Sequence, residues 1–191
     1  DREIEMSALE AAYKNPIASL FVVYGRRRVG KTTLLAEFCK GKHALYYLAT
    51  EESIQANCAA FREMAADFLQ DELLRSAANA GWEMIFKTLL AQPSEEKLVI
   101  IIDEFQYLGK ADKAFPSVFQ KIWDTQLKNE NVEVILCGSL VHMMMEQTLS
   151  YSSPLYGRRT GQIKLKQIPY AYYNQFFPAM SEQERILYYA V

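Results

Sequence analysis

The chain has 191 residues, a formal net charge of −2 and a composition in which half of the residues are hydrophobic. Such a composition excludes a disordered chain, and the near-neutral charge gives no overall basic excess of the kind that marks many nucleic-acid binders. No apolar run approaches the ~20 residues of a membrane-spanning helix, so we expect a cytoplasmic α/β domain that does not enter a membrane. The cysteines Cys39, Cys58 and Cys137 have no CxxC spacing, which is typical of reduced thiols.

The hydrophobic pattern predicts strands that alternate with helices. Five apolar runs predict strands at 20–24, 44–49, 97–103, 132–138 and 161–168. Helical spacing is found over 1–10, 31–40, 54–68, 82–91, 114–129, 139–150, 170–177 and 181–190, with Ser53 as a candidate cap. This alternation predicts a doubly wound parallel sheet with right-handed crossovers, whose ligands bind beyond the carboxyl ends of the strands.

The stretch GRRRVGKTT, residues 25–33, follows the first predicted strand and matches the phosphate-binding pattern GxxxxGK[ST]. Gly25 and Gly30 allow a close backbone approach, so the amides of residues 28–32 (Arg28, Val29, Gly30, Lys31 and Thr32) can point at phosphate oxygens. Lys31 would contact the β- and γ-phosphates, and the Thr32 hydroxyl would bind Mg²⁺. The role of Arg26, Arg27 and Arg28 stays open between nucleotide, domain carboxylates, a partner and solvent.

Two acidic residues, Asp103 and Glu104, directly follow the apolar run LVIII. We expect Asp103 to hold Mg²⁺ beside Thr32 and Glu104 to polarise the water that attacks the γ-phosphate. Gln106 either orients the same water, senses the γ-phosphate or has no special role. The adjacent pair favours hydrolysis, because a protein that only binds nucleotide can dispense with the second carboxylate.

Further polar residues flank the last two predicted strands. Ser139 follows the fourth strand and either hydrogen-bonds the attacking water or caps the next helix. Arg158 and Arg159 precede the fifth strand, and a guanidinium there would assist phosphoryl transfer, from the same chain or from a neighbouring subunit, unless both are ordinary surface residues. No [NT]KxD motif for guanine is present, so ATP is the expected nucleotide.

Together, the motifs VVYGRRRVGKTTLL, LVIIIDEFQYL, VILCGSLVHMM and PLYGRRTGQIKL resemble the archaeal-type ATPase family of prokaryotic AAA+ (STAND-like) proteins. The resemblance covers nearly the whole chain. It implies a P-loop NTPase three-layer sandwich with strand order 5-1-4-3-2, and ATP and Mg²⁺ bound by Gly30, Lys31, Thr32, Thr33 and Asp103. It also implies catalysis by Glu104, a sensor at Ser139, an acting arginine at 158 or 159, and Arg2 and Glu3 near the base.

The resemblance also predicts how the chain is divided. Residues 1–168 would form the nucleotide-binding domain and residues 169–191 the start of a helical lid, with a C-terminal effector domain beyond this chain. The expected function is Mg²⁺-dependent ATP hydrolysis that drives or gates that effector, which could be DNA-related, in a possible homo-oligomer. The alternative is a nucleotide-gated switch with negligible turnover; a DNA-dependent motor and a small-molecule kinase fit the sequence less well.

Overall fold

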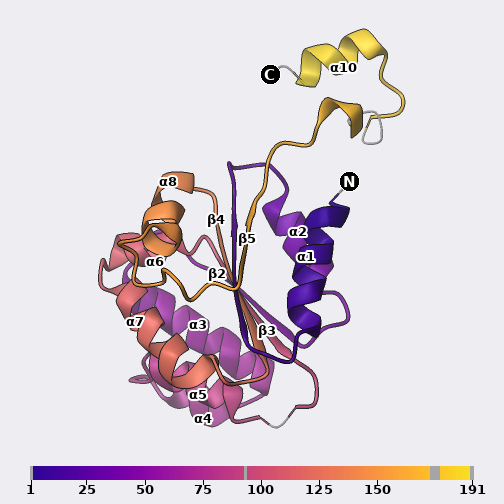
Figure 1. Cartoon of the computed structure of the whole chain (residues 1–191). Coiled ribbons are helices and arrows are strands. Elements are labelled where there is room, and N and C mark those ends of the chain that lie inside the picture. Colours follow the sequence, from indigo (N-terminus) through magenta and orange to yellow (C-terminus); the bar gives the residue numbers. More distant parts are fainter. Residues whose placement is uncertain (1, 93, 173–176, 190–191) are drawn as a thin grey trace.

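The computed structural model describes residues 2–92, 94–172 and 177–189. Its centre is a five-stranded parallel sheet in the order β2-β3-β4-β1-β5 (Figure 1). The strands are β1 (Ser19–Tyr24), β2 (Ala44–Leu48), β3 (Leu98–Asp103), β4 (Val132–Gly138) and β5 (Gly161–Lys164). The predicted order 5-1-4-3-2 is confirmed, and β5 lies at an edge as its alternating sequence indicated.

Helices cover both faces of the sheet and make the predicted three-layer sandwich (Figure 1). One layer contains α1 (Glu3–Lys14) and α2 (Lys31–Phe38). The other contains α3 (Ile54–Leu69), α4 (Glu72–Ser76), α5 (Trp82–Leu90), α6 (Gln106–Ala111), α7 (Phe115–Ile122) and α8 (Val141–Met144). Helix α10 (Glu182–Tyr189) stands beyond the carboxyl edge of the sheet.

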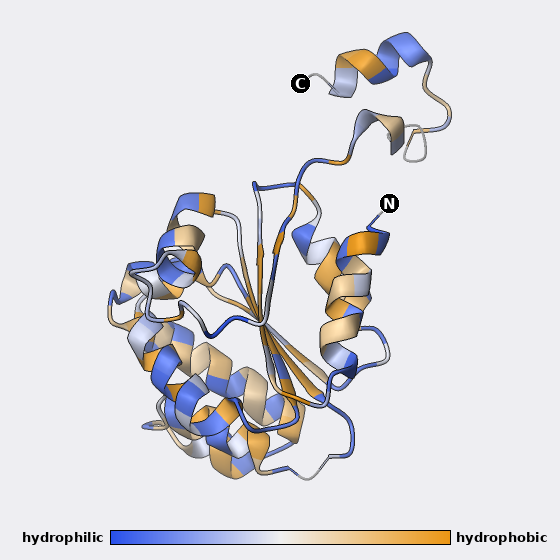
Figure 2. Cartoon of the chain, viewed as in Figure 1, coloured by the Kyte–Doolittle hydropathy of each residue, from blue (hydrophilic) through white to orange (hydrophobic). Residues whose placement is uncertain are grey.

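Successive side chains of each strand enter two separate cores, because a strand alternates its faces. In β1, Leu20 and Val22 pack in the core under α3–α8, whereas Phe21 and Val23 pack with Leu35 against α1 and α2. This double burial explains the unbroken apolar runs of the central strands β1 and β3. The edge strands β2 and β5 bury only alternate residues, and Figure 2 shows hydrophobic residues concentrated in the centre of the sheet.

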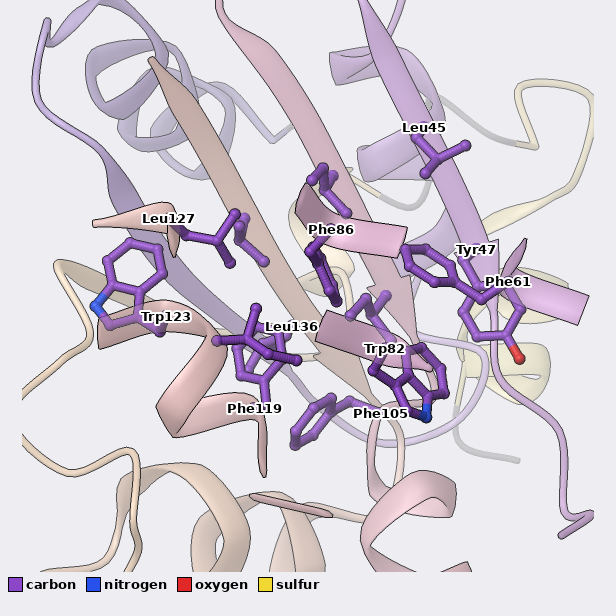
Figure 3. Close-up of a cluster of buried hydrophobic side chains, with 14 of the residues drawn as sticks. Leu45, Tyr47, Phe61, Trp82, Phe86, Phe105, Phe119, Trp123, Leu127 and Leu136 are labelled. Atoms are coloured by element: carbon purple, nitrogen blue, oxygen red, sulfur yellow. The ribbon is translucent and has the colours of Figure 1, made fainter. Parts of the chain in front are cut away.

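Aromatic rings fill the larger core (Figure 3). The Phe61 ring lies 5.2 Å from both the Trp82 and the Phe86 ring centroids, and Phe105 lies 5.8 Å from Phe119. These contacts join α3 to α5, and they join α7 to Phe105, the residue that follows Glu104. The aromatic core therefore supports the carboxyl edge of the sheet, where the polar motifs lie.

Two helices were missed by the prediction, and several predicted boundaries were wrong. Helices α4 and α6 were not predicted, although Asp71 caps α4 by accepting hydrogen bonds from two of its amides. The predicted helices 114–129 and 139–150 start at 115 and 141 and continue as π-helical turns over Trp123–Leu127 and Met145–Leu149.

At the C-terminal end, strand β5 stops at Lys164 rather than at 168, because β1, the strand with which it pairs, ends at Tyr24. Of the predicted helix 170–177, residues 170–172 are helical and 173–176 lie outside the described residues. Ser53 does cap α3, as predicted. Within the described part of the chain, no helix has the length and apolar character to cross a bilayer.

Candidate active site

The polar motifs meet at the carboxyl edge of the three central strands. The loop from Gly25 to Gly30, called here the glycine loop, follows β1; Asp103 ends β3, and Ser139 follows β4. Because β4 lies between β1 and β3, these strand ends are neighbours. The Thr32 hydroxyl donates a hydrogen bond to Asp103 Oδ2 at 3.3 Å, which joins the first two motifs directly.

Two glycines shape the glycine loop for different reasons. Gly30 has a φ of +91°, in the left-handed region that favours glycine. A Cβ at Gly25 would lie 2.3 Å from the carbonyl oxygen of Leu165, so only glycine fits against the chain that leaves β5. Arg28 also has a positive φ, of +66°. The loop is therefore held in one specific shape.

The ammonium group of Lys31 lies inside this loop. Lys31 is 6% exposed, and its Nζ donates to the carbonyl oxygens of Gly25 at 2.9 Å and Arg26 at 3.0 Å. Both acceptors are neutral backbone groups. The positive charge of Lys31 is thus available to an anion bound at the loop.

Asp103 is 3% exposed and accepts hydrogen bonds from three sides. Besides Thr32, the Tyr46 hydroxyl donates to Oδ2 at 2.6 Å and the Glu104 amide donates to Oδ1 at 2.9 Å. Burial, and then the bond to Asp103, raise the pKa of Tyr46, so its hydroxyl remains a donor. Sequence analysis missed Tyr46, because a tyrosine in an apolar strand is indistinguishable from a core residue until the register of β2 on β3 is known.

Glu104 has a backbone φ of +54°, which is unusual for a residue with a side chain. Its Oε2 accepts hydrogen bonds from the backbone amide and the hydroxyl of Ser139, at 3.2 and 2.8 Å, and from the side-chain amide of the buried Gln106. Ser139 is not the cap of α8: Leu140 occupies that position, so the capping alternative was wrong. Ser139 and Gln106 instead fix the orientation of the Glu104 carboxylate.

The structure does not bring Arg158 and Arg159 to this site. They precede β5, and the adjacent Thr160 amide bonds Leu20 near the start of β1, so both lie toward the amino edge of the sheet. Arg158 forms an ion pair with Asp124 at 2.8 Å and lowers the pKa of that carboxyl; Arg159 lies over the Tyr156 ring. Action on a nucleotide of the same chain is therefore not supported, and action on a neighbouring subunit stays a prediction.

Two adjoining cavities contain the remaining predicted binding residues. A cavity of about 630 Å³ is lined by Lys31, Thr32, Glu104 and residues of the β2–α3 connection. A second, of about 550 Å³, is mostly apolar and is lined by residues that include Arg2, Val29 and Leu34. Arg28, Gly30 and Thr33 line both cavities. The two cavities therefore adjoin, one lined mainly by polar residues and the other mostly apolar; Glu3 lines neither.

The donor set beside Lys31 fits a magnesium ion. Mg²⁺ prefers oxygen ligands, and the Thr32 hydroxyl and the Asp103 carboxylate are such ligands in contact with each other. Over the described ranges, no three His, Cys, Asp or Glu side chains gather as a metal site of their own. A bound Mg²⁺ would therefore share its coordination with a phosphate ligand and water.

Comparison with known proteins decides the family. Residues 1–187 match the family model described as an ATPase domain predominantly from Archaea. The chain belongs to this family. An uncharacterised protein of Methanocaldococcus jannaschii is 37% identical to this ATPase domain over 189 residues, and a second protein of that organism, described as ATP-binding, is 43% identical over 42 residues, 22% of the domain and 71% of that protein.

Solved structures share the fold of the ATPase domain. The Walker-type ATPase of Pyrococcus abyssi has a TM-score of 0.59 at 23% identity, covering 97% of the domain and 61% of that chain. A STAND protein of Pyrococcus horikoshii with a tetratricopeptide repeat sensor has a TM-score of 0.61 at 18% identity, covering all of the domain and 27% of that chain. The Cdc6 protein of Pyrobaculum aerophilum has a TM-score of 0.66 at 14% identity, covering 93% of the domain and 48% of that chain. The ATPase domain also spans only 40% of the first M. jannaschii relative.

Proposed function

We propose that this ATPase domain binds ATP with Mg²⁺ across the two adjoining cavities and hydrolyses the γ-phosphate. We further propose that hydrolysis drives or gates an attached effector or DNA-related domain. The observation that carries the proposal is the contact of Thr32 with Asp103, at a cavity that both Thr32 and Glu104 line. A phosphate-binding threonine, a metal-binding carboxylate and a candidate base thus share one site.

Binding would divide between the two cavities. The amides of residues 28–32 and the Lys31 ammonium would hold the triphosphate, while the apolar cavity beside Arg2 and Leu34 would take the base. Arg2 supports this arrangement because its guanidinium donates to the carbonyl oxygens of Val29 and Lys166 and so ties α1 to the glycine loop. Thr32 and Asp103 would hold Mg²⁺, which neutralises charge on the phosphates when bound.

In the proposed reaction, the Glu104 carboxylate accepts a proton from a water molecule. The water oxygen forms a bond to the γ-phosphorus, and the bond from that phosphorus to the bridging oxygen breaks, giving ADP and inorganic phosphate. Ser139 and Gln106 are positioning residues here, because their bonds to Glu104 Oε2 hold the carboxylate in one orientation.

The decisive test compares Glu104→Gln with Lys31→Ala in the full-length protein. Glu104→Gln should reduce phosphate release at least about a hundredfold, the usual loss when a general base is removed, with ATP affinity nearly unchanged. Lys31→Ala should lower both, since a charged phosphate contact is lost. Glu130→Gln, an exposed carboxylate remote from the site, is the control. Unchanged phosphate release in Glu104→Gln contradicts hydrolysis through Glu104.

A nucleotide-gated switch is the second candidate function. It is favoured by the three donors that engage Glu104 Oε2, because a carboxylate held by Ser139 and Gln106 is less free to accept a proton from water. A switch predicts that ATP changes the assembly state in size-exclusion chromatography while phosphate release stays at background. Hydrolysis predicts release that depends on Glu104.

The wider role is proposed from the greater length of a relative. Because the domain spans 40% of its M. jannaschii relative, we propose that residues 169–191 begin a helical lid and that an effector domain follows. Homo-oligomer formation would allow Arg158 or Arg159 to reach a neighbour's nucleotide. A cytoplasmic location agrees with the three free cysteines.

A further inference from the structure

A third cavity also borders the glycine loop and shares part of its lining, Arg27, Arg28, Val29 and Gln167, with the proposed nucleotide cavities. Its volume is about 680 Å³, and it is formed by the glycine loop, Val141 at the start of α8, and the chain that leaves β5. Five of the residues that line it are cationic: Arg26, Arg27, Arg28, Lys164 and Lys166. None of its described lining residues is acidic.

The five cations have no carboxylate partner within ion-pair distance among the described residues. Some cations elsewhere on the surface form ion pairs, such as Arg75 with Asp67 and Arg158 with Asp124, whereas others, such as Lys87 and Lys113, are isolated rather than clustered. The net charge of the whole chain is −2, so these five cations form a local concentration of positive charge on a slightly acidic protein. Like charges around one cavity repel each other, and a bound anion would relieve that repulsion.

We propose that this cavity binds the phosphate backbone of a nucleic acid. The planar guanidinium of arginine matches phosphate oxygens in a bidentate manner, and lysine adds a compact positive charge. Among the described residues, no aromatic side chain lines the cavity, so we expect contacts to the backbone that are independent of sequence rather than stacking of bases.

The exposure of the cations favours a polymer over a small anion. All five side chains are exposed, as expected for residues that follow a backbone running over the surface. A small enclosed anion is more often held by buried polar groups. Backbone phosphates would also contact the consecutive arginines of the glycine loop, of which Arg26 lines neither nucleotide cavity.

Lys164 and Lys166 allow the third cavity to be tested independently of nucleotide binding. Arg27 and Arg28 also line the proposed nucleotide cavities, whereas Lys164 and Lys166 line only the third cavity. Substitution of these lysines therefore tests the nucleic-acid site while leaving the ATP contacts intact. The inference does not rest on ATP hydrolysis.

The test measures binding of the full-length protein to a fluorescent 20-nucleotide DNA, single- and double-stranded, by anisotropy over a range of salt concentrations. Lys164→Glu/Lys166→Glu should weaken binding at least about tenfold and reduce the salt slope by about 1 to 2, since each lost phosphate contact contributes roughly 0.7–0.9. Lys87→Glu/Lys113→Glu, which makes the same charge change on exposed residues outside the cavity, should stay within about twofold of wild type. ATP affinity should be unchanged in both pairs.

Three outcomes would overturn the proposal. The first is unchanged DNA affinity in Lys164→Glu/Lys166→Glu, and the second is an equal loss in the control pair, which would show only a long-range charge effect. The third is lysine-dependent binding of inorganic tripolyphosphate, in the presence of saturating ATP, without binding of DNA. The neutral pair Lys164→Gln/Lys166→Gln should give an intermediate loss, and ATP titration of each variant shows separately whether the nucleotide site remains formed.

Discussion

At the scale of single residues, the most unusual group outside the site is Glu133 in β4. It is fully buried, and neither of its carboxyl oxygens has a hydrogen-bond partner within the described structure. Burial raises its pKa to about 8, against an opposing influence of Lys97 and Lys42 and with a further rise from Glu10. Lys97, nearly buried itself, donates to the Ile17 carbonyl oxygen rather than to Glu133.

This environment predicts a pH-dependent free energy of unfolding. Between the ordinary pKa of about 4.5 and the folded value of about 8, the native state holds a proton that the unfolded state has lost, so stability falls as pH rises through this window. Glu133→Gln is neutral at every pH and should flatten that slope, which amounts to roughly 4 kcal/mol between pH 4.5 and pH 8 in the wild type. Urea unfolding from pH 5 to 9 measures it.

The control for this prediction is Glu130→Gln, an exposed carboxylate close by in the sequence, which should leave the pH dependence as in wild type. A Glu133→Gln variant whose stability declines with pH as steeply as wild type would show that the buried carboxyl does not titrate in this range.

At the scale of elements, the site depends on how the glycine loop is held against β5. The Leu165 amide donates to the Tyr24 carbonyl oxygen at 2.7 Å, and the Cα of Gly25 lies against the Leu165 carbonyl. Leu165, which directly follows the short edge strand β5, therefore supports the glycine loop in which the Lys31 ammonium lies. A change at this contact should affect stability and nucleotide binding together.

Gly25→Ala tests this coupling. The added methyl would overlap a backbone oxygen at 2.3 Å, so we expect a loss of about 1–3 kcal/mol in stability together with weaker ATP binding. Asp71→Ala removes the cap of α4, a helix that lines neither nucleotide cavity, and should cost about 1 kcal/mol with ATP affinity unchanged. Thermal unfolding and ATP calorimetry on both variants separate the effects. If Gly25→Ala binds ATP as wild type does, β5 does not position the loop.

At the scale of the whole molecule, the candidate base and the candidate arginines lie toward opposite edges of the sheet. Glu104 follows the carboxyl end of β3, whereas Arg158 and Arg159 precede the amino end of β5. The two can share a nucleotide only if a second copy brings its arginines to the first copy's site. Catalysis by one of these arginines would therefore require assembly.

Mixing two inactive variants tests that link. Lys31→Ala lacks its own site but keeps its arginines, and Arg158→Ala/Arg159→Ala has the reverse defect. Random assembly of equal amounts should restore about a quarter of wild-type ATP hydrolysis, because a quarter of the sites combine an intact loop with an intact neighbour. A mixture of Lys31→Ala with Glu104→Gln should restore none. No recovery in the first mixture, or full activity of the arginine variant alone, contradicts action between subunits.

The sequence by itself determined the features that depend on local order: the strand–loop–helix around Lys31, the acids after an apolar strand, and the alternation that leads to a doubly wound sheet. These are readable because periodicity and motif spacing act over a few residues.

Only the tertiary structure decided which side chains meet across strands. It placed Tyr46 on Asp103, assigned Ser139 to Glu104 rather than to a helix cap, and put Arg158 on Asp124 away from the site. It also gathered Lys164 and Lys166 with the arginines of the glycine loop around one cavity. Such contacts depend on strand order, register and crossover direction, and long-range packing sets these.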